Sequence, residues 1–220
     1  MTFGDNGTIV DEVSRAETIK ARANTLREIR EKGFCIHHHC SNQVARRLSI
    51  RVVVRDTGTS RIGSATQFIE VPNLKNDRLT LSGILLQRFE PQSKSEQTVG
   101  EQKQFQSDEQ RDIATRAFRA EMNLRFGYGI YNAKLDQATN SSQLTMQFKI
   151  FKDGKELFAS KEKDVKLVEA SDPRRLVAEG TLTLAKTIQP GDYVLQAIVR
   201  DSMAKGSDQA TQWIDFEIIR

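Results

Sequence analysis

Short runs of alternating apolar and polar residues recur along the chain, with turn residues between them. Alternation with a period of two is typical of half-buried β-strands. The clearest case is Gln147–Phe151, which is followed by Asp153-Gly154 and a returning run, a spacing that predicts a hairpin with a type I′ turn. The strands expected from this pattern lie within residues 78–88, 118–134, 144–159, 176–184, 193–200 and 211–219.

Two stretches of the chain match each other without a gap at a separation of 145 residues. They are Val52-Val-Val-Arg-Asp56 with Ala65-Thr-Gln-Phe-Ile-Glu70, and Ala197-Ile-Val-Arg-Asp201 with Ala210-Thr-Gln-Trp-Ile-Asp215. A repeated strand, turn and strand indicates two related β modules. We therefore predict an all-β fold. An antiparallel immunoglobulin-like Greek-key sandwich is expected over residues 74–220, preceded by a partial, related β module over residues 1–73.

Three further features refine this picture. Pro190-Gly-Asp-Tyr193 is typical of a tyrosine corner, whose hydroxyl bonds back to nearby backbone; an ordinary turn before a buried ring is the alternative. Phe68 and Trp213 occupy equivalent positions of the repeat, and we expect both in the core rather than on a ligand-binding surface. Gln92–Arg111 is rich in glutamine and charge and has little to bury, which favours a loop or a helical insertion.

Composition excludes several classes of protein. The chain has 220 residues, of which 38% are hydrophobic and 28% charged, as in soluble globular proteins. Its 33 basic and 29 acidic residues give a net charge of +4, too small to argue for a nucleic acid partner. No apolar run is long enough to span a bilayer, so no membrane insertion is expected. The first residues carry no basic region followed by an apolar core, so no signal peptide is predicted.

Both cysteines and all three histidines lie in one cluster, Cys35-Ile-His37-His38-His39-Cys40. Thiolates and imidazoles are zinc ligands, so the candidate metal ligands are Cys35, His37, His39 and Cys40. Adjacent histidines in an extended segment point to opposite faces, and the chain offers no second ligand pair. Adventitious binding is therefore favoured over a dedicated zinc site. A disulfide between Cys35 and Cys40 would close only a small loop.

A displaced reading frame offers another explanation for residues 35–50. A shift by one base is compatible with Pro-Gly-Ala-Tyr at positions 45–48, which lie 145 residues before Pro190-Gly-Asp-Tyr193. The shift removes the cysteines, the histidines and the mismatch between the repeats together. We therefore expect residues 35–50 to carry no evolved function, and a restored frame to stabilise the first module by burying a tyrosine ring.

No catalytic constellation is predicted. The sequence contains no Gly-x-Ser-x-Gly, no glycine-rich phosphate loop before a helix, and no histidine outside the cluster to act as a base. We expect neither enzymatic activity nor a cofactor. A local basic patch is interpreted as a solvated strand face; it consists of Arg46, Arg47, Arg51, Arg55 and Arg61.

Seven strings together resemble the C-terminal part of the von Willebrand factor A-related proteins of acidobacteria. They are Arg51-Val-Val-Val-Arg-Asp56, Arg61-Ile-Gly-Ser-Ala-Thr-Gln-Phe-Ile-Glu-Val-Pro72, Leu79-Thr-Leu-Ser-Gly-Ile84, Tyr128-Gly-Ile-Tyr-Asn132, Phe151-Lys-Asp-Gly-Lys155, Pro190-Gly-Asp-Tyr193 and Ala210-Thr-Gln-Trp-Ile-Asp-Phe216. The resemblance implies an exported parent protein, secreted or periplasmic, with a signal peptide and an A-type domain ahead of these modules. The adhesion motif of that domain, Asp-x-Ser-x-Ser, is missing. Asp56-Thr-Gly-Thr-Ser60 has glycine where serine is required, so no adhesion-site residue is transferred.

Three functional hypotheses remain. The first is a non-catalytic β-sandwich module of an exported adhesion-like protein, a spacer or protein-interaction unit whose partners are other proteins or the A-type domain of its parent. The second is a carbohydrate-binding module with Tyr128, Tyr131 and Trp213 as its aromatic platform. The third is a zinc-binding protein that uses the cluster at residues 35–40. The sequence does not predict the oligomeric state.

Overall fold

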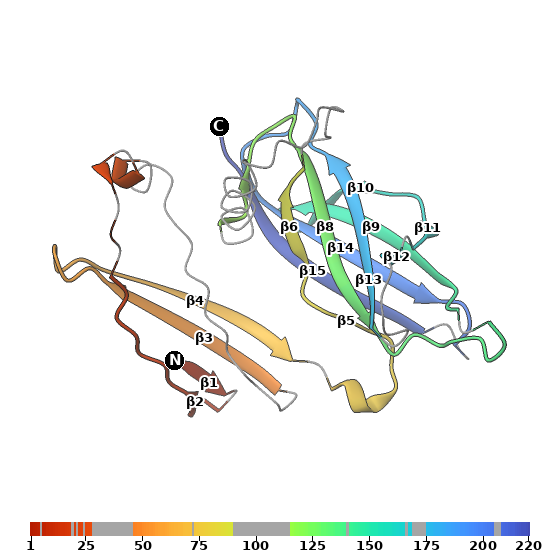
Figure 1. Cartoon of the computed structure of the whole chain (residues 1–220). Coiled ribbons are helices and arrows are strands. Elements are labelled where there is room, and N and C mark those ends of the chain that lie inside the picture. The colour runs from red at the N-terminus through yellow and green to blue at the C-terminus, as the bar shows by residue number, and fades with distance from the viewer. Residues whose placement is uncertain are drawn as a thin grey trace. The chain divides into compact units, whose positions relative to one another are not determined.

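In the described part of the computed structural model in Figure 1, almost all regular secondary structure is β-strand. It describes residues 1–4, 6–18, 20, 22–23, 25–27, 46–71, 73–89, 115–139, 141–165, 167–168, 175–204 and 208–220. The described chain divides into two compact units, and the first ends at Asn76 while the second begins at Asp77. The boundary therefore lies three residues beyond the one expected from the sequence.

The first unit contains one antiparallel sheet in the order β2-β1-β3-β4. Its strands are β1 (Thr2–Gly4), β2 (Ile9–Asp11), β3 (Arg46–Arg55) and β4 (Ile62–Val71). β3 and β4 pair along their whole length, whereas β1 is paired with β3 only at Leu48, Ser49 and Ile50. Leu48 and Thr2 are buried at this end of the sheet. A short 3-10 turn, η1 (Leu74–Asn76), closes the unit.

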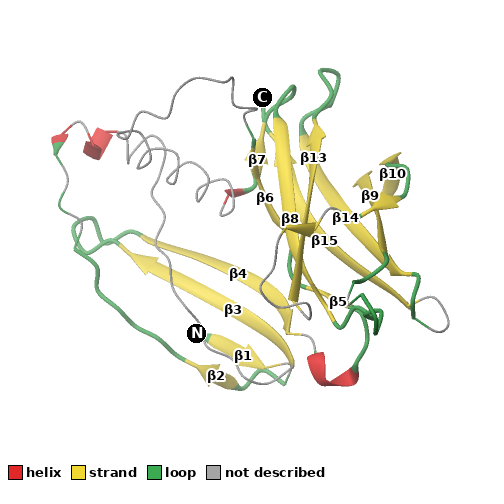
Figure 2. Ribbon diagram, turned by 45° about the vertical axis from the view of Figure 1, so that its right-hand side comes forward, coloured by secondary structure: helices red, strands yellow, loops and turns green. Residues whose placement is uncertain are grey.

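The second unit contains two sheets, which form the two layers visible in Figure 2. The first layer has the order β10-β9-β14-β15-β7, and β11 also pairs with β9. Its strands are β7 (Ala117–Phe118), β9 (Leu144–Lys152), β10 (Lys155–Ala159), β11 (Lys163–Asp164), β14 (Gly191–Asp201) and β15 (Asp208–Ile218). The prediction that residues 194–199 form a central strand, with residues 211–218 paired beside it, is confirmed.

The second layer has the order β12-β13-β8-β5, and β6 also pairs with β8. Its strands are β5 (Thr80–Leu81), β6 (Leu85–Arg88), β8 (Asn123–Tyr131), β12 (Leu167–Val168) and β13 (Arg175–Thr183). Every described pairing in the unit is antiparallel except that of β7 with β15. The predicted all-β, antiparallel sandwich class is therefore confirmed for the part of the chain that the structure describes.

The core lies between these layers and follows from the alternation along their strands. Every second residue of β8 points inward, so Leu124, Phe126, Tyr128 and Ile130 are buried. The ring of Phe126 meets that of Phe148 from the other layer edge to face, at a centroid distance of 5.4 Å. A Cβ at Gly180 would lie 2.4 Å from the Phe126 ring, so glycine is required where β13 passes it.

Two local predictions meet different outcomes. Asp153 and Gly154 have φ values of 50° and 74°, the double positive φ of the predicted type I′ turn between β9 and β10. The single strand expected over residues 78–88 is instead split into β5 and β6, which both pair with β8. Ser82 N donates to Gly129 O at 2.9 Å, but Gly129 N donates to the Ser82 hydroxyl at 2.8 Å instead of to its backbone carbonyl, so the regular ladder stops between them.

The tyrosine corner predicted before β14 is present. The Tyr193 hydroxyl donates a hydrogen bond to the carbonyl oxygen of Gln189 at 2.6 Å. Its ring is buried and stacks on Phe216 of β15 at a centroid distance of 5.6 Å. The corner therefore fixes the entry of β14 into the core. The expected loop at Gln92–Arg111 lies outside the described residues.

Candidate binding surfaces

Trp213 and Phe68 point away from the core, which corrects the expectation that both are core residues. Their side chains are 63% and 59% exposed. The reason is strand parity: Ala210, Phe216 and Ile218 of β15 face inward, so Trp213 faces outward. An aromatic residue in a strand thus does not by itself predict burial, because aromatic residues favour strands whichever face of the sheet they occupy.

The two hairpins carry the same outward-facing triplet of threonine, aromatic and acid. In β4 it is Thr66, Phe68 and Glu70, and in β15 it is Thr211, Trp213 and Asp215; the members of each triplet are two residues apart. Each acid is ion-paired with an arginine. The distance from Arg47 Nε to Glu70 Oε1 is 3.8 Å, and from Arg116 Nη1 to Asp215 Oδ1 it is 3.0 Å.

Polar side chains surround Trp213 on the outer face of the first layer. Gln196 of β14 lies directly opposite it, and Lys149 of β9 is the next residue in the same row. Lys149 Nζ forms an ion pair with Glu156 Oε2 of β10 at 2.7 Å. An exposed indole among amide, ammonium and carboxylate groups can stack on a ligand while its neighbours hydrogen-bond to it. This patch, the Trp213 surface, is the strongest candidate binding site in the described chain.

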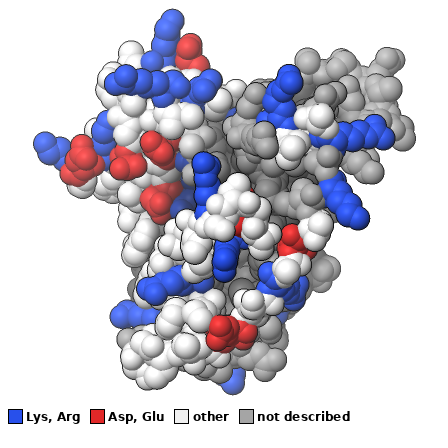
Figure 3. Space-filling model, turned by 90° about the vertical axis from the view of Figure 1, so that its left-hand side faces the viewer, with Lys and Arg blue, Asp and Glu red and all other residues white. Residues whose placement is uncertain are grey.

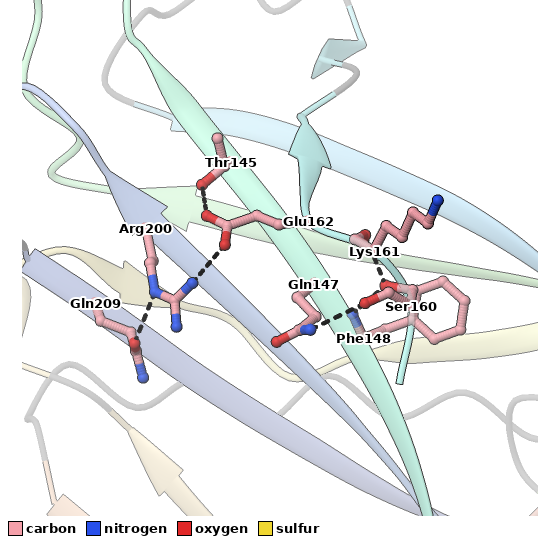
Figure 4. Close-up of polar contacts among 8 residues, drawn as sticks. All are labelled: Thr145, Gln147, Phe148, Ser160, Lys161, Glu162, Arg200 and Gln209. Carbon is pink, nitrogen blue, oxygen red and sulfur yellow. Dashed lines mark hydrogen bonds and ion pairs between the residues drawn. The ribbon is translucent and has the colours of Figure 1, made fainter. Parts of the chain in front are cut away.

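A second polar network lies on the same face, near the turn between β14 and β15, and links these two strands to β9 (Figure 4). Arg200 Nη1 lies 2.5 Å from Glu162 Oε2, and Arg200 Nε donates to Gln209 Oε1 at 3.1 Å. Thr145 donates its hydroxyl hydrogen to the other oxygen of Glu162. Because every one of these groups is engaged by another, the network is best explained as cross-strand support.

Segment 160–162 is held beside β9 at both ends, by Ser160 and by β11, which follows it and pairs with Met146 and Thr145. The Ser160 hydroxyl accepts a hydrogen bond from Phe148 N at 3.0 Å, and Gln147 Nε2 donates to the Ser160 carbonyl at 2.9 Å (Figure 4). With the segment in this position, the Glu162 carboxylate lies within ion-pair distance of Arg200. The sequence contained no signal for this contact, since Glu162 and Arg200 are 38 positions apart.

The aspartates that follow the two repeated strands both organise turns. Asp201 is buried and accepts hydrogen bonds from Lys134 N at 2.7 Å and Met203 N at 2.9 Å. Asp56 is exposed and accepts from Gly58 N at 2.9 Å and from the Thr59 hydroxyl. The hydrogen bond from Thr59, followed by that from Gly58, lowers the pKa of Asp56 below its ordinary value. Asp56-Thr-Gly-Thr-Ser60 is therefore a hydrogen-bonded turn.

Three members of the basic patch lie along one face of the first hairpin. Arg47, Arg51 and Arg55 alternate along β3 and are exposed, which agrees with a solvated strand face. The Arg51 guanidinium lies 5.3 Å from the centre of the Phe3 ring. Basic and acidic side chains are interspersed on the face drawn in Figure 3, with uncharged surface between them.

The other residues named from the sequence do not join the Trp213 surface. Tyr128 belongs to the opposite layer and is buried, and burial raises its pKa to about 12. Tyr131 is half-buried at the end of the same strand, β8. The candidate zinc ligands Cys35, His37, His39 and Cys40 lie outside the described residues. Within the described ranges, no three His, Cys, Asp or Glu side chains are grouped as a metal site requires.

No protein-family model matches the chain, and a search of curated proteins finds no significant relative. Among the helical residues that the structure describes, none belongs to a helix long and apolar enough to cross a membrane.

Proposed function

We propose that the chain is a non-catalytic β-sandwich module that binds protein within an exported, adhesion-like parent. The observation that carries this proposal is the exposure of Trp213 beside Gln196 and Lys149 on the outer face of the sheet. Tryptophan is enriched among the residues that dominate protein–protein binding energy. The ion pairs beside it, Lys149 with Glu156 and Arg116 with Asp215, supply the polar rim typical of such sites.

The finer fold assignment is an immunoglobulin-like Greek-key sandwich. Its support is the strand order: β12, β13 and β8 with β5 and β6 correspond to one sheet of such a domain, and β9, β14 and β15 correspond to the other. The bond from Tyr193 to Gln189 at the start of β14 has the place of a tyrosine corner in that scheme. Domains of this class commonly act as spacers and binding modules, but fold alone does not determine function.

A direct binding measurement tests the proposal. The probe is a recombinant A-type domain from an acidobacterial von Willebrand factor A-related protein, immobilised for biolayer interferometry with the full chain. We expect saturable binding that Trp213→Ala weakens at least about tenfold, since interface tryptophans contribute most. The matched control is Leu85→Ala, which removes a residue 56% exposed on β6 of the other layer. Absence of binding, or an equal loss in both variants, would reject the proposal.

The resemblance also predicts the genetic context. A parent gene of the proposed kind encodes a signal peptide and an Asp-x-Ser-x-Ser motif upstream of residue 1, which places the protein outside the cytoplasm. Sequencing the DNA around the gene checks this, and the same reads test the frame of the codons for residues 35–50. Flanking DNA that encodes neither the signal peptide nor the Asp-x-Ser-x-Ser motif would reject the proposal of an adhesion-like parent protein.

Carbohydrate binding is the second candidate, and the specific observation in its favour is again the exposed indole with Gln196 beside it. The chain contains one tryptophan, so all tryptophan fluorescence comes from this surface. The probes are cellohexaose and chitohexaose, titrated to about 5 mM, a range that includes weak binding. A saturable shift of the emission, with no binding of the A-type domain, would make carbohydrate the ligand.

A further inference from the structure

The sheet of the first unit has the same strand arrangement as one layer of the sandwich. Its strand order is β2-β1-β3-β4, and the first layer of the second unit contains β10-β9-β14-β15 in the matching order. The repeated sequence stretches make β3 the counterpart of β14, and β4 that of β15. By its place in the sheet, β1 is therefore the counterpart of β9, and β2 is the counterpart of β10.

The register of the pairing supports the correspondence of β1 with β9. Thr2 of β1 is paired with Ile50 of β3. The residue that follows Ile50 by 145 positions, the separation of the repeat, is Leu195, and it is paired with Ile150 of β9. Thr2 and Ile150 therefore occupy equivalent positions, one in each sheet.

The two outer hairpins also share an irregularity. In β1–β2 the register shifts between Thr2 and Phe3, so Val10 is the extra residue of a β-bulge. In β9–β10 the register shifts at the equivalent step, and the extra residue is Leu157. A β-bulge is a defined feature of a particular strand pair rather than a random defect. Its presence at the same step is a second observation in favour of the correspondence.

The counterparts β1 and β9 differ in length. β9 has nine residues, whereas β1 has three and runs along only one end of β3 (Figure 2). The part of β9 without an equivalent is Leu144–Phe148, which pairs with Ala197–Asp201. The equivalent stretch of β3 is Val52–Arg55, here called the open β3 edge. Among the described strands, none pairs with the open β3 edge on the side of β1.

Two residues present backbone hydrogen-bonding groups at the open β3 edge. Arg51 N donates to Met1 O at 2.9 Å, and Met1 N donates to Arg51 O at 3.1 Å, so the backbone groups of Arg51 point toward β1. These groups alternate in direction along a strand, so those of Val53 and Arg55 point to the same side, beyond the start of β1. Such a row of groups is a template on which another strand can pair.

We propose that the open β3 edge is the binding site of a β-strand that leads into Met1 in the longer parent protein. The inference rests on the proposed function for this source of the strand alone. The bound strand continues β1 in antiparallel register, as Leu144–Phe148 does in β9. Its first, third and fifth residues are apolar, because Leu144, Met146 and Phe148 are the buried residues of that stretch. Main-chain hydrogen bonds hold such a strand, and its alternate side chains make it specific.

The bound strand would give cross-strand neighbours to both faces of β3. Val52, Val53 and Val54 are 50%, 59% and 60% exposed. The apolar third and fifth residues of the strand would lie beside Val54 and Val52, and its fourth residue beside Val53 on the other face. In the second unit the equivalent contacts are made by β9, and Ala197, Ile198 and Val199 are all buried.

Other edges and occupants are less well supported. In the described chain β4 also has an open edge, but its counterpart β15 is paired on that side only at Glu217 and Ile218. The second unit therefore identifies no occupant for β4, whereas β9 identifies one for β3. A second copy is disfavoured by charge, because a β3–β3 pair centred on Val53 would set Arg51 directly opposite Arg55.

Attaching the missing strand to the full chain tests the site. One variant carries Leu-Thr-Met-Gln-Phe, the sequence of Leu144–Phe148, directly ahead of Met1. The matched control carries Leu-Pro-Met-Pro-Phe. It keeps the three apolar side chains but lacks the two N–H groups that would donate to the carbonyl groups of Val53 and Arg55. Far-ultraviolet circular dichroism verifies that both variants are folded.

The measurement is amide hydrogen exchange, followed residue by residue by NMR. We expect the first segment to slow exchange at Val53 and Arg55 at least about tenfold relative to the wild type, since pairing protects these amides. With the proline segment we expect the wild-type rates. Val52 and Val54, whose N–H groups point toward β4, are the internal reference.

Two results at the open β3 edge would overturn the proposal. Unchanged exchange at Val53 and Arg55 in the first variant would show that the edge does not bind this strand. Equal slowing by both segments would show that apolar contact alone, without strand pairing, covers the edge.

The source of the strand has its own test. The five codons directly ahead of Met1 in the parent gene, which correspond to Leu144–Phe148, should encode apolar residues at the first, third and fifth positions. A stop codon in that stretch, or charged residues at those positions, would reject the source. None of these measurements involves Trp213, so failure of the A-type domain to bind is distinguishable from failure of the strand site.

Discussion

Val54 and Val199 occupy the same position of the repeated sequence, yet the first is 60% exposed and the second is 0% exposed. Both lie in the first strand of an antiparallel hairpin, β3–β4 or β14–β15, and both precede an Arg-Asp pair. The difference comes from what surrounds each hairpin. β14 has β9 along its other edge and a second layer across its inner face, whereas β1 reaches only three residues of β3.

The two hairpins also differ in register by two residues. Ala197 is paired with Gln212, but the corresponding Val52 is paired with Ala65 rather than with Gln67. Because side chains alternate with a period of two, an even shift leaves each residue on its original face. The first hairpin therefore has a tighter turn, closed by the bond from Asp56 N to Arg61 O at 2.9 Å, without exchanging its apolar and charged faces.

The largest contrast is expected at the two turn aspartates. Asp201 is 1% exposed, and Asp201→Ala leaves the partly buried N–H groups of Lys134 and Met203 without their acceptor, which should cost about 2–4 kcal/mol. Asp56→Ala should have a clearly smaller effect, because water can reach Gly58 N and Thr59. Urea unfolding followed by far-ultraviolet circular dichroism measures both. Equal destabilisation would contradict the difference in burial.

Alkaline pH should destabilise the second unit through Tyr128. Burial raises its folded pKa from 10.0 to about 12, so the neutral form is favoured in the folded state. The stability it contributes is complete below pH 10 and is lost as pH rises through about 12, by about 2–3 kcal/mol. Tyr128→Phe should remove this loss, measured as the change in urea midpoint between pH 8 and pH 11.5, while the control Tyr131→Phe should retain it. All three tyrosines lie in the second unit, so the first is unaffected.

Substitutions at Val199 and Val54 test the effect of burial itself. Val199→Ala removes two methyl groups from a fully buried site and should cost about 2 kcal/mol. Val54→Ala makes the same change on an exposed face and should stay within about 0.5 kcal/mol. Urea titration gives both values. A large loss at Val54 would contradict the exposure of its side chain.

A smaller loss than at the buried Val199 is expected at the tyrosine corner. Tyr193→Phe removes the hydrogen bond to Gln189 but keeps the ring against Phe216, so about 1 kcal/mol should be lost. The first hairpin has Leu48 at the matching position, buried but without a hydroxyl, and Leu48→Ala should act through packing alone. Thermal denaturation gives the change in Tm for each of the two variants. No change in Tyr193→Phe would show that the hydroxyl contributes nothing at this corner.

Much of the second unit could be predicted from local pattern. Alternation located β8, β9, β13, β14 and β15, and Asp153-Gly154 located the turn between β9 and β10. The break between β5 and β6 could not be predicted, because it depends on the Ser82 hydroxyl meeting Gly129 of another strand. Burial of Trp213 was predicted wrongly, because its residue type is compatible with either face of a strand.

The sequence by itself determined which side chains share a face and where each hairpin turns, since both follow from neighbours a few residues apart. Only the tertiary structure decided which faces are covered. The repeated stretches differ little in apolar character, but burial requires a second layer opposite, and that layer comes from β8 and β13, which belong to the other sheet. The pairing of Glu162 with Arg200 also depends on tertiary contacts, because Ser160 and β11 hold the segment between them against β9.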